Sequence, residues 1–243
     1  MIFTPVINLD AASSVAQINQ GCVPGLGRGP GSKNILQSPR VDKTLKILQC
    51  NINGISTQAL RVKLDQLLDL AERLSAQIVA LQETKLRKTT LLKADEDTDM
   101  EIQGISFVWR DRSIKVFNVY HPPNNKQLQD NFNNITGENI IILGDLNAKH
   151  PMWGCATQNT RGNELVNLVD DGGFIVLNDG SPTHSSYSYN TSEALDVSII
   201  SPDLQPLCNW SVLNNIDSDH RPILLEINRK QVLEFLQGKL GCL

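Results

Sequence analysis

The sequence has 243 residues, of which 40% are hydrophobic and 20% are charged, enough apolar material for the core of one large α/β domain or of two small ones. A net charge of −4 argues against a passive nucleic-acid coat protein, which would normally be basic, but it fits an enzyme whose carboxylates hold metal ions. No apolar run approaches the ~20 residues of a membrane helix, and no basic residue opens a secretory signal. The five cysteines lack metal-ligand spacing and indicate reduced thiols, so we expect an intracellular protein. Because no long apolar run is present, we expect no membrane partner.

Composition predicts three regions. Residues 1–43 are rich in Gly and Pro with little apolar periodicity, which predicts a flexible leader. Their glycine-rich run GLGRGPG is not a phosphate-binding loop, because no strand precedes it and no GK[ST] ending follows. Residues 44–228 are predicted to form the folded domain, and residues 229–243 a C-terminal tail.

The domain is predicted to begin with a β-α-β unit. Leu45–Ile52 is an apolar run typical of a buried strand. Thr57–Leu74 repeats apolar residues with a 3.6 period, which predicts an amphipathic helix, and Gln77–Thr84 is a second buried strand. Because such a unit makes the two strands parallel, both strands end at the same edge of the sheet.

The remainder is predicted to be mostly strands, which favours α/β layers around two packed sheets. EIQGISFVWR and SIKVFNVYHPP form a hairpin, and NIIILGDLN is the strongest strand. Short helices are expected over LQDNFNNI and over residues 163–170. The further strands are expected, in chain order, at FIVLND, SSYSYN, ALDVSIIS, CNWSVLNN and RPILLEIN.

Polar residues follow or interrupt these strands in a way that suggests an active site. Glu83 follows a buried strand and is either a solvated strand-end carboxylate or a magnesium ligand. Asp145 and Asn147 lie two apart, so in an extended chain they face one side, as a base for water and a donor to a phosphate oxygen. The alternative for these two residues is an ordinary turn.

Asp196 lies inside an apolar strand, where a carboxylate is costly unless it is paired. His220 is its natural partner, because a carboxylate orients an imidazole and raises its basicity. The pair is either catalytic or structural, and Asp219 beside it is either a second metal contact or a loop cap. The other histidines, His121, His150 and His184, are interpreted as loop residues.

No GxSxG motif and no recognisable cysteine nucleophile is present, which leaves hydrolysis by metal-activated water. Basic residues near the predicted site either steer a DNA backbone or are ordinary solvated charges. These residues are Lys85, Arg87, Lys88, Lys93 and Arg161.

Together and in this order, the motifs resemble the endonuclease/exonuclease/phosphatase superfamily, and within it the apurinic-like endonuclease domain of jockey-type non-LTR retrotransposons. The tract HPMWG followed by RGNELVNLV is similar to the retroelement branch in particular. The matching residues are Asn51 in QCNINGI, Glu83 in LQETKL, Tyr120 in NVYHPP, Asp145 and Asn147 in GDLNAKH, Asp196 in ALDVSII, and Asp219 with His220 in SDHRP.

The resemblance implies a DNase I-like, four-layered α/β sandwich of two mixed sheets flanked by helices. It implies an intracellular, nuclear enzyme that uses Mg²⁺, or Mn²⁺ in its place, to nick DNA and so prime a reverse transcriptase of the parent polyprotein. Glu83 would bind the metal with Asp219 nearby, and Asp145 would activate water. Asn51 and Asn147 would hold phosphate or metal-bound groups, and Tyr120 would contact the phosphate or the leaving oxygen. Asp196 would pair with His220.

The sequence departs from the family pattern at two places. Asn53 stands where apurinic repair enzymes carry an aspartate. Glu83 and Tyr120 are closer together than in the family, which predicts that a strand pair near residues 90–100 is missing. Two alternatives therefore stay open: the same fold acting on another phosphodiester or a phosphate monoester, and a decayed copy without activity.

Overall fold

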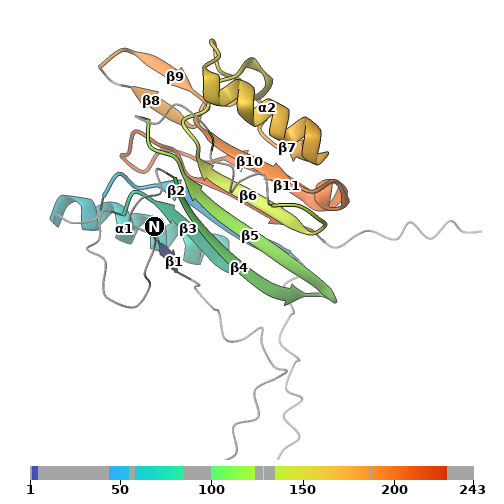
Figure 1. The fold of residues 1–243 in the computed structure, drawn as a ribbon. Helices are drawn as coiled ribbons and strands as arrows, with labels where there is room; N and C mark the ends of the chain where they lie inside the picture. Colours follow the sequence, from blue (N-terminus) through green and yellow to red (C-terminus); the bar gives the residue numbers. More distant parts are fainter. Residues whose placement is uncertain are drawn as a thin grey trace, which may run out of the picture.

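Two five-stranded sheets pack face to face in the computed structural model (Figure 1). The structure describes residues 2–4, 44–54, 58–84, 100–123, 128, 135–186 and 188–228. Among these residues, one helix packs on the outer face of each sheet, which gives four layers. The α/β sandwich implied by the resemblance is confirmed.

The first sheet has the order β1-β3-β2-β12-β11. Helix α1 (Gln58–Leu74) packs Leu67 and Ala71 against Leu48 and Val79 on its outer face. As the β-α-β prediction requires, β2 and β3 are parallel, whereas β12 pairs antiparallel with both β2 and β11. The strands are β1 (Ile2–Thr4), β2 (Leu45–Asn51), β3 (Ile78–Gln82), β11 (Cys208–Val212) and β12 (Ile223–Ile227).

The second sheet has the order β4-β5-β6-β10-β7, and helix α2 (Thr160–Gly172) lies over its outer face (Figure 1). The short 3-10 helix η3 (Pro151–Trp153) follows β6, and η4 (Pro202–Leu207) connects β10 to β11 of the first sheet. Strands β8 (His184–Ser186) and β9 (Thr191–Glu193) form a separate hairpin. The sheet strands are β4 (Glu101–Trp109), β5 (Arg112–Tyr120), β6 (Ile140–Asp145), β7 (Ile175–Val176) and β10 (Asp196–Ile200).

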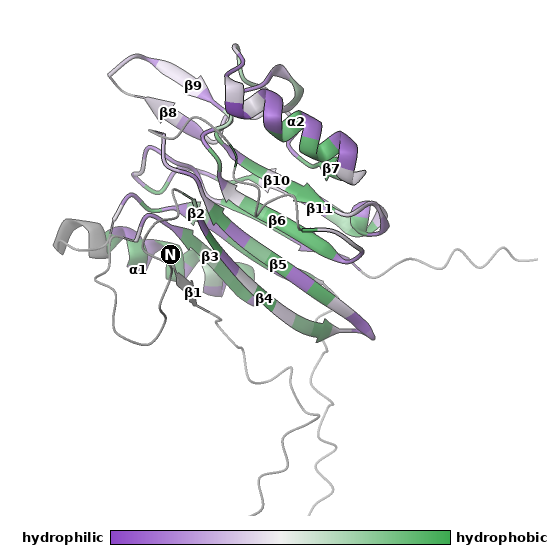
Figure 2. Cartoon of the chain, viewed as in Figure 1, coloured by the Kyte–Doolittle hydropathy of each residue, from purple (hydrophilic) through white to green (hydrophobic). Residues whose placement is uncertain are grey.

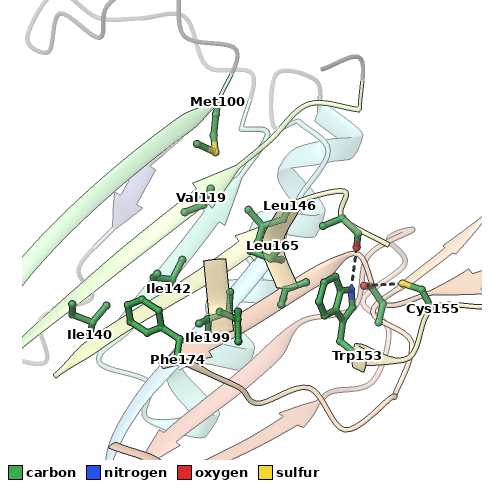
Figure 3. Packing of buried hydrophobic residues seen from close by; sticks show 14 residues of the cluster. Met100, Val119, Ile140, Ile142, Leu146, Trp153, Cys155, Leu165, Phe174 and Ile199 are labelled. Atoms are coloured by element: carbon green, nitrogen blue, oxygen red, sulfur yellow. Dashed lines mark hydrogen bonds between the residues drawn. The ribbon is translucent and has the colours of Figure 1, made fainter. Parts of the chain in front are cut away.

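The core is divided by the alternation of side chains along each strand. Ile47 and Ile141 belong to the cluster between the two sheets, whereas their neighbours Leu48 and Ile142 belong to the clusters under α1 and α2. Figure 2 shows hydrophobic residues concentrated along β6 and β10. Under α2, Trp153 is fully buried and donates its indole N–H to the carbonyl of Ala148 at 3.0 Å (Figure 3).

Several local predictions differ from the structure. Ile2–Thr4, within the predicted leader, pairs antiparallel with β3, whose edge otherwise presents unpaired backbone groups. Helix α2 begins at Thr160, before the predicted start, because the Asn159 side chain accepts from the Gly162 N–H as an N-cap. The segment SSYSYN is not one strand, because β8 ends at Ser186 and a turn follows at residues 188–190. The strand expected at FIVLND is reduced to the two residues of β7.

Other predictions lie outside the described residues. These are the remainder of the leader, the segment 85–99 with the predicted loss of a strand pair, most of the helix expected over LQDNFNNI, and the tail 229–243. Within the described part of the chain, no helix is long and apolar enough to cross a membrane.

Candidate active site

The strands that face each other across the sandwich change from apolar to polar at one end. Along β2, the inward positions Leu45 and Ile47 are followed by Gln49 and Asn51, and along β6 Ile141 and Leu143 are followed by Asp145. Side chains two apart share one face of a strand, so each stripe delivers polar groups to the same end of the inter-sheet layer. The buried polar residues at this end are Gln49, Asn51, Gln82, Asn118, Asp145 and Asp196.

Asn51 connects carboxylates from the two sheets. Its side-chain nitrogen donates to Glu83 Oε1 at 2.9 Å and to Asp145 Oδ2 at 2.8 Å. Its side-chain oxygen accepts from the backbone N–H of Asn53 at 3.0 Å, which fixes the orientation of the amide. Two carboxylate oxygens therefore meet at one nitrogen, which concentrates negative charge beside the Asn51 amide.

Three site residues just beyond strand ends adopt left-handed backbone conformations. Asn53, Glu83 and Asn147 have φ of 49°, 48° and 47°. Asparagine tolerates this region, but glutamate rarely adopts it, and such strain costs about 1–3 kcal/mol and clusters at functional sites. The prediction that Asp145 and Asn147 lie in one extended segment is therefore wrong, because Asn147 is left-handed. The strand ends at Asp145, whose Oδ1 accepts from the Asn147 N–H at 3.0 Å, while the Asn147 side chain donates to the His121 carbonyl.

Asp196 and His220 lie side by side in the interior. His220 Nδ1 is 2.8 Å from Asp196 Oδ2, and its Nε2 is 3.8 Å from Asp145 Oδ2. Asp196 is fully buried, and its Oδ1 accepts from Gln49 Nε2 at 2.9 Å. The imidazole is therefore held between two carboxylates, with one ring nitrogen bonded and the other directed toward Asp145.

These contacts shift the pKa of each group. Burial alone would lower the pKa of His220, but Asp196 and then Asp145 raise it to about 9, so the ring is cationic at neutral pH. Burial would raise the pKa of Asp196, but His220 holds it below its ordinary value. Burial and the neighbouring Asp196 raise the pKa of Asp145 to about 7, against the opposing effect of His220.

Tyr120 and Asp219 line the same region. The pKa of the half-buried Tyr120 hydroxyl is raised, first by burial and then by the charge of Glu83 and a side-chain hydrogen bond with Glu83. Asp219 accepts from Asn53 Nδ2 at 3.2 Å and from the Ser218 hydroxyl at 3.2 Å. Although burial opposes it, the charge of His220 lowers the pKa of Asp219, so this group is a carboxylate at neutral pH.

The carboxylates of this region are ligands of the kind that a divalent cation takes. Glu83 and Asp145 converge on the Asn51 amide, and Asp219 is a half-buried carboxylate beside His220. Hard cations such as Mg²⁺ take one or two carboxylates and keep their other positions for water and phosphate oxygens. The residues predicted to bind metal, Glu83 and Asp219, are compatible with this chemistry.

Arg161 is not part of a DNA-facing rim. It is only 4% exposed, and its guanidinium donates to the carbonyls of Leu146 at 3.0 Å and Pro122 at 3.1 Å. It also reaches the carbonyls of His121 and Pro123 at 3.4 Å. Arg161 therefore ties together the loops that follow β5 and β6. The other basic residues of the predicted rim, Lys85, Arg87, Lys88 and Lys93, lie outside the described residues.

Sequence reasoning missed the polar layer behind the site. Gln49 Nε2 donates to Gln82 Oε1 at 2.8 Å, Gln82 Nε2 donates to Asn118 Oδ1, and Asn118 Nδ2 donates to the Leu81 carbonyl at 3.0 Å. The signal was available, because each of these amides interrupts an apolar strand at an inward position.

His184, interpreted as a loop residue, lies on β8 with its ring centroid 4.6 Å from that of His220. No local sequence signal indicated this approach.

Comparison with known proteins defines the class. A family model described as endonuclease-reverse transcriptase matches residues 114–224, which include Asp145, Asp196 and His220. The endonuclease domain of TRAS1, a telomere-specific non-LTR retrotransposon, superposes with a TM-score of 0.59 at 20% identity, covering 76% of this chain and 98% of that domain. AP endonuclease LMAP from Leishmania major gives 0.54 at 14% identity, covering 77% and 88%. The fold is thus that of the endonuclease/exonuclease/phosphatase class.

Sequence relatives narrow the resemblance within this class. RNA-directed DNA polymerase from mobile element jockey of Drosophila funebris is 30% identical over 136 residues, covering 54% of this chain and 15% of the relative. The protein of the same name from Drosophila melanogaster is 36% identical over 118 residues, covering 46% and 13%. The chain therefore matches only a small part of these relatives. The predicted resemblance to the endonuclease region of jockey-type non-LTR retrotransposons is confirmed.

Proposed function

We propose that the chain is a Mg²⁺-dependent endonuclease that nicks DNA by attack of water on a phosphodiester. The observation that carries the proposal is the meeting of Glu83, Asp145 and Asn51 at hydrogen-bond distance, with the His220 imidazole 3.8 Å from Asp145. Asn51 and Asp145 lie on strands of different sheets, so segments far apart in the sequence supply this group.

Asp145 is suited to receive the proton of the attacking water. Its Oδ1 is held by the Asn147 N–H and its Oδ2 by Asn51, so the carboxylate cannot rotate away. A pKa of about 7 matches the range in which a general base is both deprotonated and basic at neutral pH.

His220 would act on the phosphoryl group. Asp196 bonds Nδ1 at 2.8 Å, which fixes the ring and leaves the Nε2–H to donate to a phosphoryl oxygen. With a pKa of about 9, the ring carries a positive charge at neutral pH and stabilises the negative charge that builds up during attack. Tyr120 and Asn147 are proposed to contact the phosphate at the rim.

Glu83 and Asp219 would hold the cation, with Mn²⁺ able to replace Mg²⁺. When bound, the cation supplies electrostatic stabilisation of the phosphoryl oxygens and of the leaving group. Asn51 would keep the Glu83 and Asp145 carboxylates at a fixed separation, because one nitrogen bonds both.

DNA is the proposed substrate because the sequence relatives are RNA-directed DNA polymerases of mobile elements and one similar structure is a retrotransposon endonuclease domain. The chain would then act in the nucleus beside a reverse transcriptase region of the parent polyprotein. Lys85, Arg87 and Lys88, which follow Glu83 in the sequence, are proposed to contact the DNA backbone.

The test is nicking of supercoiled plasmid by the purified chain with Mg²⁺, with and without EDTA. Wild type should yield open circles, while Asp145→Asn and His220→Ala should lower the rate by about 10²–10⁴-fold. The matched control is Glu138→Gln, another carboxylate-to-amide change at an exposed residue before β6, which should nick like wild type. Equal nicking by the Asp145 variant would refute the proposed role.

Two further measurements separate the alternatives. Turnover of a generic diester such as bis(p-nitrophenyl) phosphate without plasmid nicking would support another phosphodiester as substrate. A cooperative thermal transition without turnover of either substrate would indicate a folded but inactive copy.

A further inference from the structure

His184, Asp219 and His220 form a compact group where the β8–β9 hairpin meets the segment before β12. His184 and His220 are partners in an isolated antiparallel β-bridge. Backbone hydrogen bonds close the bridge on both sides: the Ser185 N–H donates to the Asp219 carbonyl and the Arg221 N–H to the Thr183 carbonyl, each at 2.8 Å. This backbone pairing holds the two imidazole rings together, with centroids 4.6 Å apart.

The side chains offer two imidazole nitrogens and one carboxylate oxygen within 4.8 Å of one another. Tetrahedral bonds of about 2.1 Å place ligand atoms about 3.4 Å apart. A small movement of the half-buried His184 and Asp219 side chains would bring the three ligand atoms to this spacing. Imidazole ligands favour Zn²⁺ and similar transition-metal ions, whereas Mg²⁺ prefers an all-oxygen environment. The group therefore differs in chemistry from the carboxylates around Asn51.

Asp196 completes the arrangement from behind. It bonds His220 Nδ1 at 2.8 Å, so Nε2 is the nitrogen left for a metal. A carboxylate that bonds the non-ligating nitrogen of a histidine is the usual support of a protein zinc ligand, because it fixes the ring and makes the ligating nitrogen more basic. Asp196 is fully buried, which shields this hydrogen bond from water.

We propose that His184, Asp219 and His220 form a second cation site that binds Zn²⁺ or a similar transition-metal ion and so inhibits the enzyme. Binding replaces the Nε2 proton of His220, which is released to solvent. The ion then occupies the nitrogen that would donate to the phosphoryl group and the carboxylate that would serve Mg²⁺. Metal binding stands independently of the proposed nuclease function, whereas inhibition rests on it.

The test of binding uses Co²⁺ as a spectroscopic probe on the full chain, in excess Mg²⁺ and without DNA. Wild type should develop the visible absorption of cobalt in a nitrogen and oxygen site, and added Zn²⁺ should abolish it. His184→Gln should weaken the apparent affinity by at least about tenfold. His150→Gln is the matched control, because it removes a histidine outside the group and should leave the spectrum unchanged.

Thermal melts of both variants establish that they are folded. In the nicking assay with Mg²⁺, Zn²⁺ should inhibit wild type and His150→Gln but act at least about tenfold more weakly on His184→Gln, whose nicking without Zn²⁺ should match wild type. Absence of the cobalt spectrum in wild type, or an unchanged spectrum in folded His184→Gln, would overturn the site. A cobalt spectrum without any Mg²⁺-dependent nicking would refute the proposed function alone.

Discussion

Replacing Arg161 by methionine distinguishes a buried clamp from a DNA-binding residue. The guanidinium makes two well-formed hydrogen bonds, to the carbonyls of Leu146 and Pro122, and two longer ones. Hydrogen bonds from a charged donor contribute about 1.5–3 kcal/mol each to stability. Part of this loss is offset in the variant, because a buried methionine carries no charge that must be desolvated. We expect a net loss of about 3 kcal/mol, which lowers the melting temperature of a domain of this size by about 10 °C.

The assay combines urea or thermal unfolding with DNA affinity measured over a range of salt concentrations in EDTA. A clamp predicts lower stability and an unchanged dependence of affinity on salt, whereas a phosphate contact predicts unchanged stability and a salt slope reduced by about 1. Arg110→Met, at an exposed arginine over Trp109, is the control and should melt within about 0.5 kcal/mol of wild type. If Arg161→Met is as stable as wild type and its DNA affinity depends less on salt, then Arg161 contacts DNA and does not hold the loops together.

Three further predictions concern the site and its support. Folding raises the pKa of His220 from 6.5 to about 9, so its protonation should stabilise the fold by on the order of 3 kcal/mol. In EDTA, this stabilisation should be complete below pH 6.5 and lost as the pH rises through about 9. In His220→Gln, the melting temperature should depend less on pH over this range. Gly144→Ala should cost about 3 kcal/mol or more in urea unfolding, because φ is +147° and a Cβ would lie 1.8 Å from the Val119 carbonyl oxygen. Mg²⁺ should raise the melting temperature of wild type but not of Glu83→Gln; an equal rise in both would remove Glu83 from the metal site.

Much of the architecture follows from hydrophobic periodicity. The 3.6 period predicted α1, and the apolar runs predicted β2, β3 and β6, because burial on both faces leaves few alternatives for such sequences. The site residues at strand ends were predictable for the same reason, since parallel strands bring their ends to one edge. The amides of Gln49, Gln82 and Asn118 carried a readable signal, because a polar residue in a buried strand requires a partner.

The remaining features depend on packing between distant segments. Arginine is usually exposed, so nothing local indicated that Arg161 would be buried among carbonyls of the β5 and β6 loops. His184 approaches His220 only because β8 bridges the segment before β12. The pairing of Ile2–Thr4 with β3 likewise depends on an available sheet edge and not on any pattern in those three residues.

Charge balance at the site sets the order in which ligands bind. Asp145, Asp196 and Asp219 face the cationic His220, and Glu83 shares the Asn51 amide with Asp145. The pKa of Asp145 is raised to about 7, so this carboxyl is partly protonated at neutral pH. A DNA phosphate would add negative charge to this group, so we expect a cation to bind before the phosphate does. DNA affinity should therefore be higher in Ca²⁺, another hard oxygen-binding cation, than in EDTA at equal ionic strength. Equal affinity in the two conditions would mean that the phosphate does not enter the carboxylate cluster.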